Sequence, residues 1–170
     1  GAESDGAHRK VDGMRAVPAR QKSLKDAIDW SYKLLSEEEQ KLFSYLSVFS
    51  GGFTLEAAEN IFSQAFTETT ISALIASLLD KSLLQCTFNA RGDARFNLLI
   101  TIQQFALNRL RHLGEETKAR NLHLAYFLGL AEHADGVIHG PDQIEWMDRI
   151  ESEHDNLGAA LDYCVANQET

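Results

Sequence analysis

The chain has 170 residues, of which 44% are apolar, and so it is long enough to bury the core of one domain or two small ones. Its net charge of −9 argues against a general affinity for nucleic acid, because phosphate binding needs clustered lysine and arginine. No apolar run approaches the ~18 residues of a membrane-spanning helix and nothing resembles a signal peptide, so we expect a cytoplasmic protein.

The positive charge is concentrated near the start of the chain. Residues 8–25 carry six basic residues and one acid, whereas acids outnumber bases from Asp26 onward. Residues 1–19 show no apolar period and are expected to form a disordered or extended basic arm. This arm is either a solvated linker or a contact for a polyanion. The bases that would make such a contact are Arg9, Lys10, Arg15, Arg20 and Lys22.

Helix patterns dominate residues 20–81. Residues 20–35 read as the end of a helical arm, with Ser23 as the expected N-cap. Ser36 and Glu39 have the spacing of a capping box, and Gly51-Gly52 is expected to end the helix that this box begins. Thr54 is expected to cap the next helix, and apolar residues at helical spacing predict a third over residues 70–81.

A β-hairpin is predicted next. Residues 81–88 and 94–98 alternate in polarity around the turn-rich segment 89–93. A closing helix then reaches about Leu113. Three helices, a hairpin and a helix in this order predict a winged helix-turn-helix domain over residues 36–113, within a mainly α-helical fold. Cys86 in the hairpin and Cys164 near the end of the chain are expected to be small buried apolar residues.

Residues 114–170 predict helices in series. Gly136 and Gly140-Pro141 are expected to break the first of them. The last helix, from about Ser152 to Ala166, is expected to bury its apolar positions, which are Leu157, Ala160, Leu161, Cys164 and Val165. We interpret this region as the start of a TPR-like helical repeat, with an uncovered apolar face that offers a surface for self-association.

No catalytic motif accompanies these elements. The glycines never form the G-x-x-x-x-G-K-S/T loop that holds phosphates, and no nucleophile elbow is present. Glu151 and His154 have the spacing of one carboxylate–histidine motif, but a carboxylate-bridged metal site needs two. We therefore expect no enzymatic activity, no metal and no cofactor bound by this segment.

DNA binding is the main alternative function. Winged helices often place a recognition helix in the major groove. The candidate helix, residues 70–81, has no arginine, asparagine or glutamine for base contacts, and Asp80 would repel phosphate. Arg91 and Arg95 in the hairpin would then have to bind DNA together with the basic arm, which makes this segment a poor DNA reader.

Several segments together resemble bacterial STAND-type regulators, which are signal-transducing ATPases and transcriptional regulators related to NB-ARC, SARP-type and LuxR-type proteins. Residues 20–35 (RQKSLKDAIDWSYKLL) resemble the family's RQRTLRAAIDWSYDLL, and residues 46–58 (LSVFSGGFTLEAA) resemble LSVFAGGFTLEAA. Residues 78–84 (LLDKSLL), 98–106 (LLITIQQFA) and 153–157 (EHDNL) are similar to LVDKSLL, LLETIRQYA and EHDNL.

The resemblance implies a place in a larger protein. The segment would follow a nucleotide-binding domain and contain the end of a helical arm, the winged helix and the first TPR-like helices. In the family, the winged helix acts as an intramolecular clamp on that domain in the ADP-bound resting state. Its partners would be its own upstream nucleotide-binding domain and the downstream helical repeats, and ADP or ATP would bind only in the upstream domain.

One family position departs from the pattern. Leu98, Leu99 and Ile100 stand where relatives keep a polar triad near the phosphates of the nucleotide. These side chains offer neither a charge nor a hydrogen bond, and Gln103 stands where arginine is usual. We therefore do not expect nucleotide sensing at this position.

Overall fold

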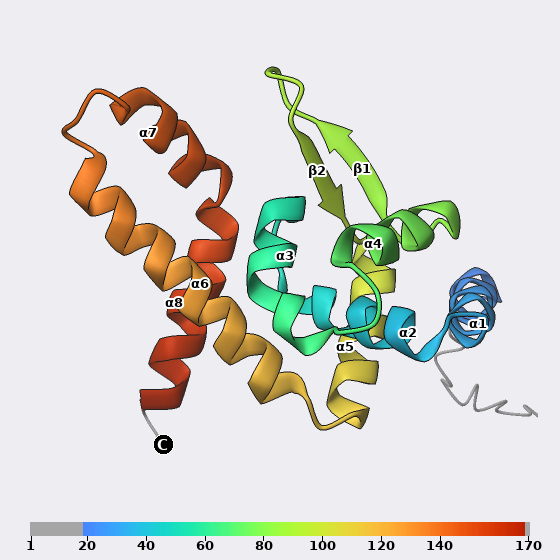
Figure 1. Cartoon of the computed structure of the whole chain (residues 1–170). Helices are drawn as coiled ribbons and strands as arrows, with labels where there is room; N and C mark the ends of the chain where they lie inside the picture. Colours follow the sequence, from blue (N-terminus) through green and yellow to red (C-terminus); the bar gives the residue numbers. More distant parts are fainter. Residues whose placement is uncertain (1–18, 169–170) are drawn as a thin grey trace, which may run out of the picture.

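The computed structural model describes residues 19–168, which are mainly helical, as the sequence predicts (Figure 1). The helices and strands are α1 (Ala19–Lys33), α2 (Glu37–Tyr45), η1 (Leu46–Val48), α3 (Leu55–Phe62), η2 (Ser63–Ala65), α4 (Ile71–Asp80), β1 (Gln85–Phe88), β2 (Ala94–Asn97), α5 (Ile100–His112), α6 (Glu116–Val137), α7 (Gln143–Ser152) and α8 (His154–Gln168). Helices α2 to α5 and the β1–β2 hairpin have the arrangement of a winged helix-turn-helix.

The starts of α2 and α3 agree with the expected caps. The hydroxyl of Ser36 accepts a hydrogen bond from the Glu39 N–H while the Glu39 carboxylate accepts one from the Ser36 N–H, which completes the capping box. The hydroxyls of Thr54 and Thr70 cap α3 and α4 by accepting the N–H of Ala57 and Ala73, without a reciprocal carboxylate. Ser23 is not an N-cap, because α1 begins at Ala19 and the good helix formers before Ser23 extend it.

An aromatic core holds the winged helix together. Phe43, Tyr45, Phe53 and Phe62 are fully buried where α2, α3 and the loop after η1 meet. Tyr32 of α1 packs edge-on against Phe105 of α5, with ring centroids 5.5 Å apart. Helix α1 is therefore attached to the winged helix along α5.

The hairpin forms the wing, and β1 is its outer strand. Phe53 bonds the far side of β2 through an isolated bridge to Phe96, so β2 lies between Phe53 and β1. All four residues of β1 are exposed, and the expectation that Cys86 is buried is therefore wrong. The expectation rested on Cys86 sharing a strand face with Leu84, which is buried. Leu84 lies at the base of the wing, whereas Cys86 lies further along β1, beyond the core.

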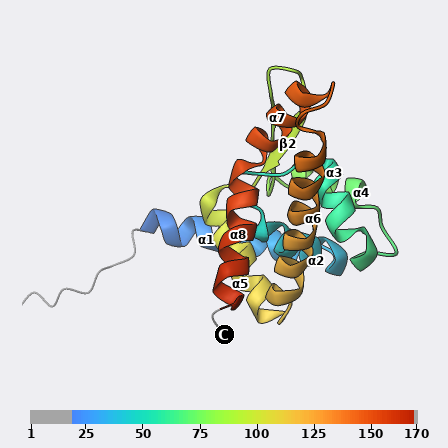
Figure 2. The same cartoon turned by 90° about the vertical axis from the view of Figure 1, so that its left-hand side faces the viewer.

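The last three helices form a hairpin beside α3. Helix α6 runs away from α5, α7 packs on its far part, and α8 returns along it (Figures 1 and 2). Gly136 does not break α6, because an exposed glycine with open space around it costs a helix only about 1 kcal/mol. No helix within residues 19–168 is long and apolar enough to cross a membrane.

The buried face of α8 differs from the expected one. Ala160 is buried and Leu157 is half-buried, as expected, and Asn156 is also completely buried. Leu161 and Val165 are 65% and 57% exposed, and Cys164 is half-buried, so the prediction of their burial is wrong. The reason is that α8 packs against α6 along one side only and leaves the opposite side to solvent.

Candidate functional site

Two glycines allow the loop after η1 to pass between β2 and α8. Both have positive φ, +69° at Gly51 and +82° at Gly52. A Cβ on Gly51 would lie 2.4 Å from the carboxylate of Asp155, and one on Gly52 would lie 2.3 Å from the side-chain oxygen of Asn97. The helical turns already end at Val48, so these glycines permit a close approach and do not end a helix, which corrects the expectation for Gly51-Gly52.

Arg95 of the wing binds both this loop and Glu153, the residue just before α8. Its Nε donates to the Gly51 carbonyl at 2.9 Å, and one Nη donates to the Gly52 carbonyl at 3.1 Å. The two Nη atoms also bond the carboxylate of Glu153 at 3.0 and 3.2 Å. The side chains of Arg95 and Glu153 are only 20% and 7% exposed. This bidentate pair is largely withdrawn from water.

Asn156 completes the contact. Its Oδ1 accepts the Ser50 N–H at 2.7 Å, and its Nδ2 donates to the Gly52 carbonyl and to Glu153, each at 2.9 Å. His123 Nε2 lies 3.2 Å from the same Oδ1, and burial lowers the pKa of this histidine. We call the set Ser50, Gly51, Gly52, Arg95, Glu153 and Asn156 the wing–helix joint. It fixes the wing and the loop to the start of α8.

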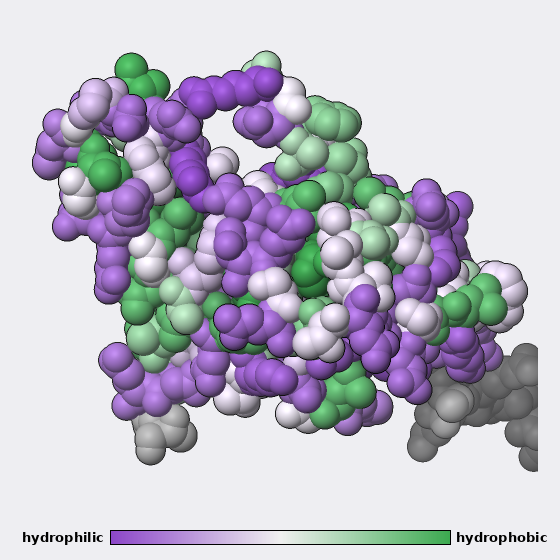
Figure 3. All heavy atoms as spheres, viewed as in Figure 1, coloured by the Kyte–Doolittle hydropathy of each residue, from purple (hydrophilic) through white to green (hydrophobic). Residues whose placement is uncertain are grey.

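Two ion pairs flank the joint. Arg91 at the wing tip pairs with Asp148 of α7, and Figure 3 shows hydrophilic residues bridging α7 and the wing. Arg149 of α7 pairs with Glu56 of α3 at 2.9 Å and lies 5.0 Å from the ring of Trp146. Both pairs are more exposed than Arg95–Glu153 and so contribute less to stability.

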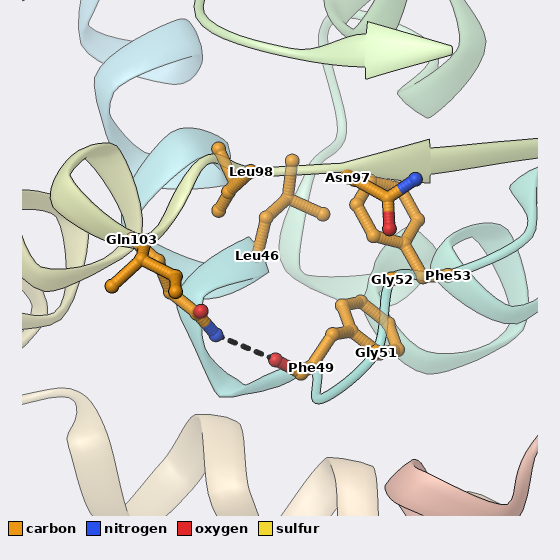
Figure 4. Close-up of a pocket in the computed structure, with 9 residues that line it drawn as sticks. Leu46, Phe49, Gly51, Gly52, Phe53, Asn97, Leu98 and Gln103 are labelled. Carbon is orange, nitrogen blue, oxygen red and sulfur yellow. Dashed lines mark hydrogen bonds between the residues drawn. The ribbon is translucent and has the colours of Figure 1, made fainter. Parts of the chain in front are cut away.

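A small cavity lies on the other side of the same loop (Figure 4). Its volume is about 200 Å³, and its lining includes Phe49, Leu98 and Ile100. Gln103 closes one end by donating to the carbonyls of Ser47 and Phe49 at 3.1 and 2.7 Å. Small-molecule sites usually have about 300–1,000 Å³. The cavity has the size of a side chain and not of a nucleotide.

The structure separates the residues considered for nucleic-acid or nucleotide contact. Arg9, Lys10 and Arg15 lie outside the described residues, and Arg20 and Lys22 are exposed on α1. The wing bases Arg91 and Arg95 are paired with Asp148 of α7 and with Glu153, which lies between α7 and α8. Leu98 and Ile100 meet at the cavity, and Leu99 beside them is half-exposed. Among the described residues, the bases of α1, the bases of the wing and the Leu98–Ile100 triad lie on separate elements.

The candidate recognition helix α4 carries little charge. Its exposed residues are Ser72, Ala73, Ala76 and Asp80. Lys81, which follows it, bonds the carboxylate of Glu39 at 2.9 and 3.0 Å. Burial opposes the ionisation of Glu39, but hydrogen bonds from Ser77, Lys81 and the Ser36 N–H outweigh it and lower its pKa to about 2.

Sequence reasoning did not pair Arg95 with Glu153 and Asn156. The signal was available, because both the Gly-Gly segment and the EHDN segment belong to the family motifs quoted above. Motifs far apart in a chain give no indication that they touch. Glu151 and His154 fall on different helices, separated by Glu153, and residues 19–168 contain no group of three potential metal ligands.

Comparison with known proteins agrees with the fold. Residues 35–111 match the family described as a winged helix-turn-helix domain. This segment is a winged helix-turn-helix domain. Over 157 residues the chain is 34% identical to proteins of Mycobacterium tuberculosis and Mycobacterium bovis, each named "Putative HTH-type transcriptional regulator". The match covers 91% of the chain and 17% of each relative.

A shorter relative from Mycobacterium tuberculosis, named "Uncharacterized protein", is 34% identical over 110 residues. This match covers 63% of the chain and 28% of that protein. No solved structure matches the chain. The chain therefore spans less than a third of the length of each of these curated relatives.

Proposed function

We propose that the chain is a non-catalytic regulatory segment of a transcriptional regulator, in which the winged helix serves as a packing module. The observation that carries this proposal is that both wing arginines pair with acids of the same chain, Arg95 in a largely buried site and Arg91 at the surface. Arg95 is committed to Glu153 and the loop carbonyls, and Arg91 to Asp148. With α4 presenting small residues and an acid, the segment offers little positive charge to DNA.

The finer proposal follows the STAND resemblance. The winged helix (residues 36–113) would pack as a clamp on an upstream nucleotide-binding domain, which residues 20–35 would join to it. Residues 114–170 would lead into further helical repeats. Exposed apolar side chains support contacts with an upstream domain and with downstream repeats. On or beside α1 and α5 they are Trp30, Leu34, Leu99 and Ile100. On the last three helices they are Leu128, Ile144, Met147, Leu161 and Val165.

Calorimetric titration of the chain with ADP and with ATP tests the assignment of nucleotide binding to another domain. We expect no heat of binding with either nucleotide, because the cavity at the position of the family's nucleotide-sensing triad is small and Leu98, Leu99 and Ile100 supply no charge there. Micromolar affinity for ADP or ATP would contradict the proposal.

DNA binding by the winged helix is the second candidate, and the names of the longer relatives favour it. It predicts that the chain binds duplex DNA with an affinity that falls steeply as salt rises. Fluorescence anisotropy with labelled duplex DNA at 50 and 200 mM salt decides between the two. The packing proposal predicts no binding at either salt concentration, and salt-sensitive binding would favour DNA recognition.

A further inference from the structure

The outer edge of β1 is a free hydrogen-bonding edge. Phe96 of β2 directs its N–H and C=O to Phe53, with N–O distances of 2.8 and 2.9 Å. Cys86 lies opposite Phe96 in the ladder, and an antiparallel ladder alternates between bonded and non-bonded pairs. The backbone groups of Cys86, and of Phe88 two residues on, therefore point away from β2. Among residues 19–168, no helix or strand lies beside β1 on that side (Figure 1).

This edge lacks the usual protection against strand pairing. The four residues of β1, Gln85 to Phe88, are uncharged and all exposed, and Phe88 is 70% exposed. Natural edge strands are normally blunted by lysine, proline, a bulge or a covering element. Cys86 and Phe88 also share one face of the wing, while Thr87 shares the other face with Arg95. The edge is thus neutral and apolar on one face.

We propose that a second copy of this chain pairs with β1 in antiparallel fashion, centred on Thr87, and so joins the two wings into one sheet. In this register the N–H and C=O of Cys86 meet those of Phe88 in the other copy, and the reverse holds by symmetry. Each Phe88 also faces a Cys86 across the pair, which buries apolar surface. The proposal does not depend on the regulatory function proposed above.

A second copy fits better than an unrelated strand. The register satisfies every free group of one β1 with the same set of groups from another, and no charged residues are brought face to face. Of the described strands only β1 has a free edge, since β2 is flanked by β1 and Phe53. Four residues bury far less than the roughly 1,000 Å² of a stable interface. The dimer is accordingly weak and dependent on concentration.

Position-specific cross-linking tests the register. In a C86S/C164S background, Thr87→Cys places two thiols across the two-fold axis, where the Cα atoms of a non-bonded pair lie about 4.5 Å apart. Gln85→Cys is the matched control, because its two copies lie about 13 Å apart. With oxidised glutathione we expect a disulfide dimer for Thr87→Cys only. Equal cross-linking at both positions, or none at Thr87→Cys, overturns the proposal.

Sedimentation under reducing conditions tests the pairing without a cross-link. Cys86→Pro removes an outward N–H and places a ring on the free edge, while Gln85 and Thr87 still bond β2. We expect the unmodified chain to dimerise at high concentration and Cys86→Pro to stay monomeric with an unchanged circular dichroism spectrum. A monomer at all concentrations, or a dimer that persists in Cys86→Pro and is lost in Leu161→Ser, overturns the proposal.

Discussion

The guanidinium of Arg95 donates two hydrogen bonds to the carboxylate of Glu153, at 3.0 and 3.2 Å, although the residues are 58 positions apart. This contact joins β2 of the wing to Glu153, the residue just before α8. It also leaves the guanidinium little capacity for a phosphate, because four of its five N–H donors bond Glu153 and the carbonyls of Gly51 and Gly52. Arg95, which the sequence offers as a nucleic-acid contact, therefore has a structural role in the wing–helix joint.

Asn156→Ala tests the buried centre of the joint. The change removes the side-chain acceptor of the Ser50 N–H and one of the two donors to the Gly52 carbonyl, and it truncates a completely buried side chain. We expect it to lower the free energy of unfolding by about 2–4 kcal/mol in urea denaturation. Asn60→Ala is the control, since this exposed amide bonds only the Glu56 carbonyl of its own helix, and its effect is expected to stay within about 0.5 kcal/mol. Equal effects would contradict the role of Asn156.

Gly51→Ala tests the close approach of the loop to α8. The new methyl group would meet the Asp155 side chain at 2.4 to 2.9 Å, and the backbone would be held at a φ of +69°. We expect a loss of about 2–4 kcal/mol, from left-handed strain plus overpacking. Gly92→Ala shares the positive φ but has open space around it, so its cost should be about 1 kcal/mol. Thermal denaturation of both variants measures the difference, and similar costs would show that crowding is unimportant.

The sequence predicts the elements of this fold well because local rules set them. Periodicity located the helices, the Ser36–Glu39 box and the Thr54 hydroxyl located the starts of α2 and α3, and turn residues located the wing. Errors arose where tertiary context decides. Gly136 continues a helix because nothing crowds it, and Leu161 is exposed because α8 is covered on one side only.

The candidate site was less predictable for a physical reason. Arg91 and Arg95 were recognised as charged wing residues, but their partners Asp148 and Glu153 lie more than 50 residues further along the chain. Charge alone does not distinguish an arginine that faces solvent from one that is paired inside the molecule. The three-dimensional arrangement, which brings Asp148 and Glu153 within reach of the wing, supplies that information.

Glu39 should make the free energy of unfolding depend on pH. Its pKa in the folded chain is about 2, below the ordinary value of 4.5, so the folded state favours the charged carboxylate. This contribution is complete above about pH 4.5 and is lost as the pH falls toward 2, with a maximum of about 3 kcal/mol. Urea denaturation of the parent chain and Glu39→Gln across that window should show the difference in stability shrinking. A constant difference would contradict the assigned role of Glu39.

A double-mutant cycle on Arg95 and Glu153 tests the wing–helix joint most directly. Arg95→Ala, Glu153→Ala and the double variant would be unfolded in urea beside the parent chain at neutral pH. The structure predicts a coupling energy of about 1.5–3 kcal/mol. Either single substitution already breaks the buried bidentate pair, so the double variant loses no further energy from it. A coupling energy below about 0.5 kcal/mol, typical of an exposed pair, would contradict the claim that the wing is held to α8 through these two side chains.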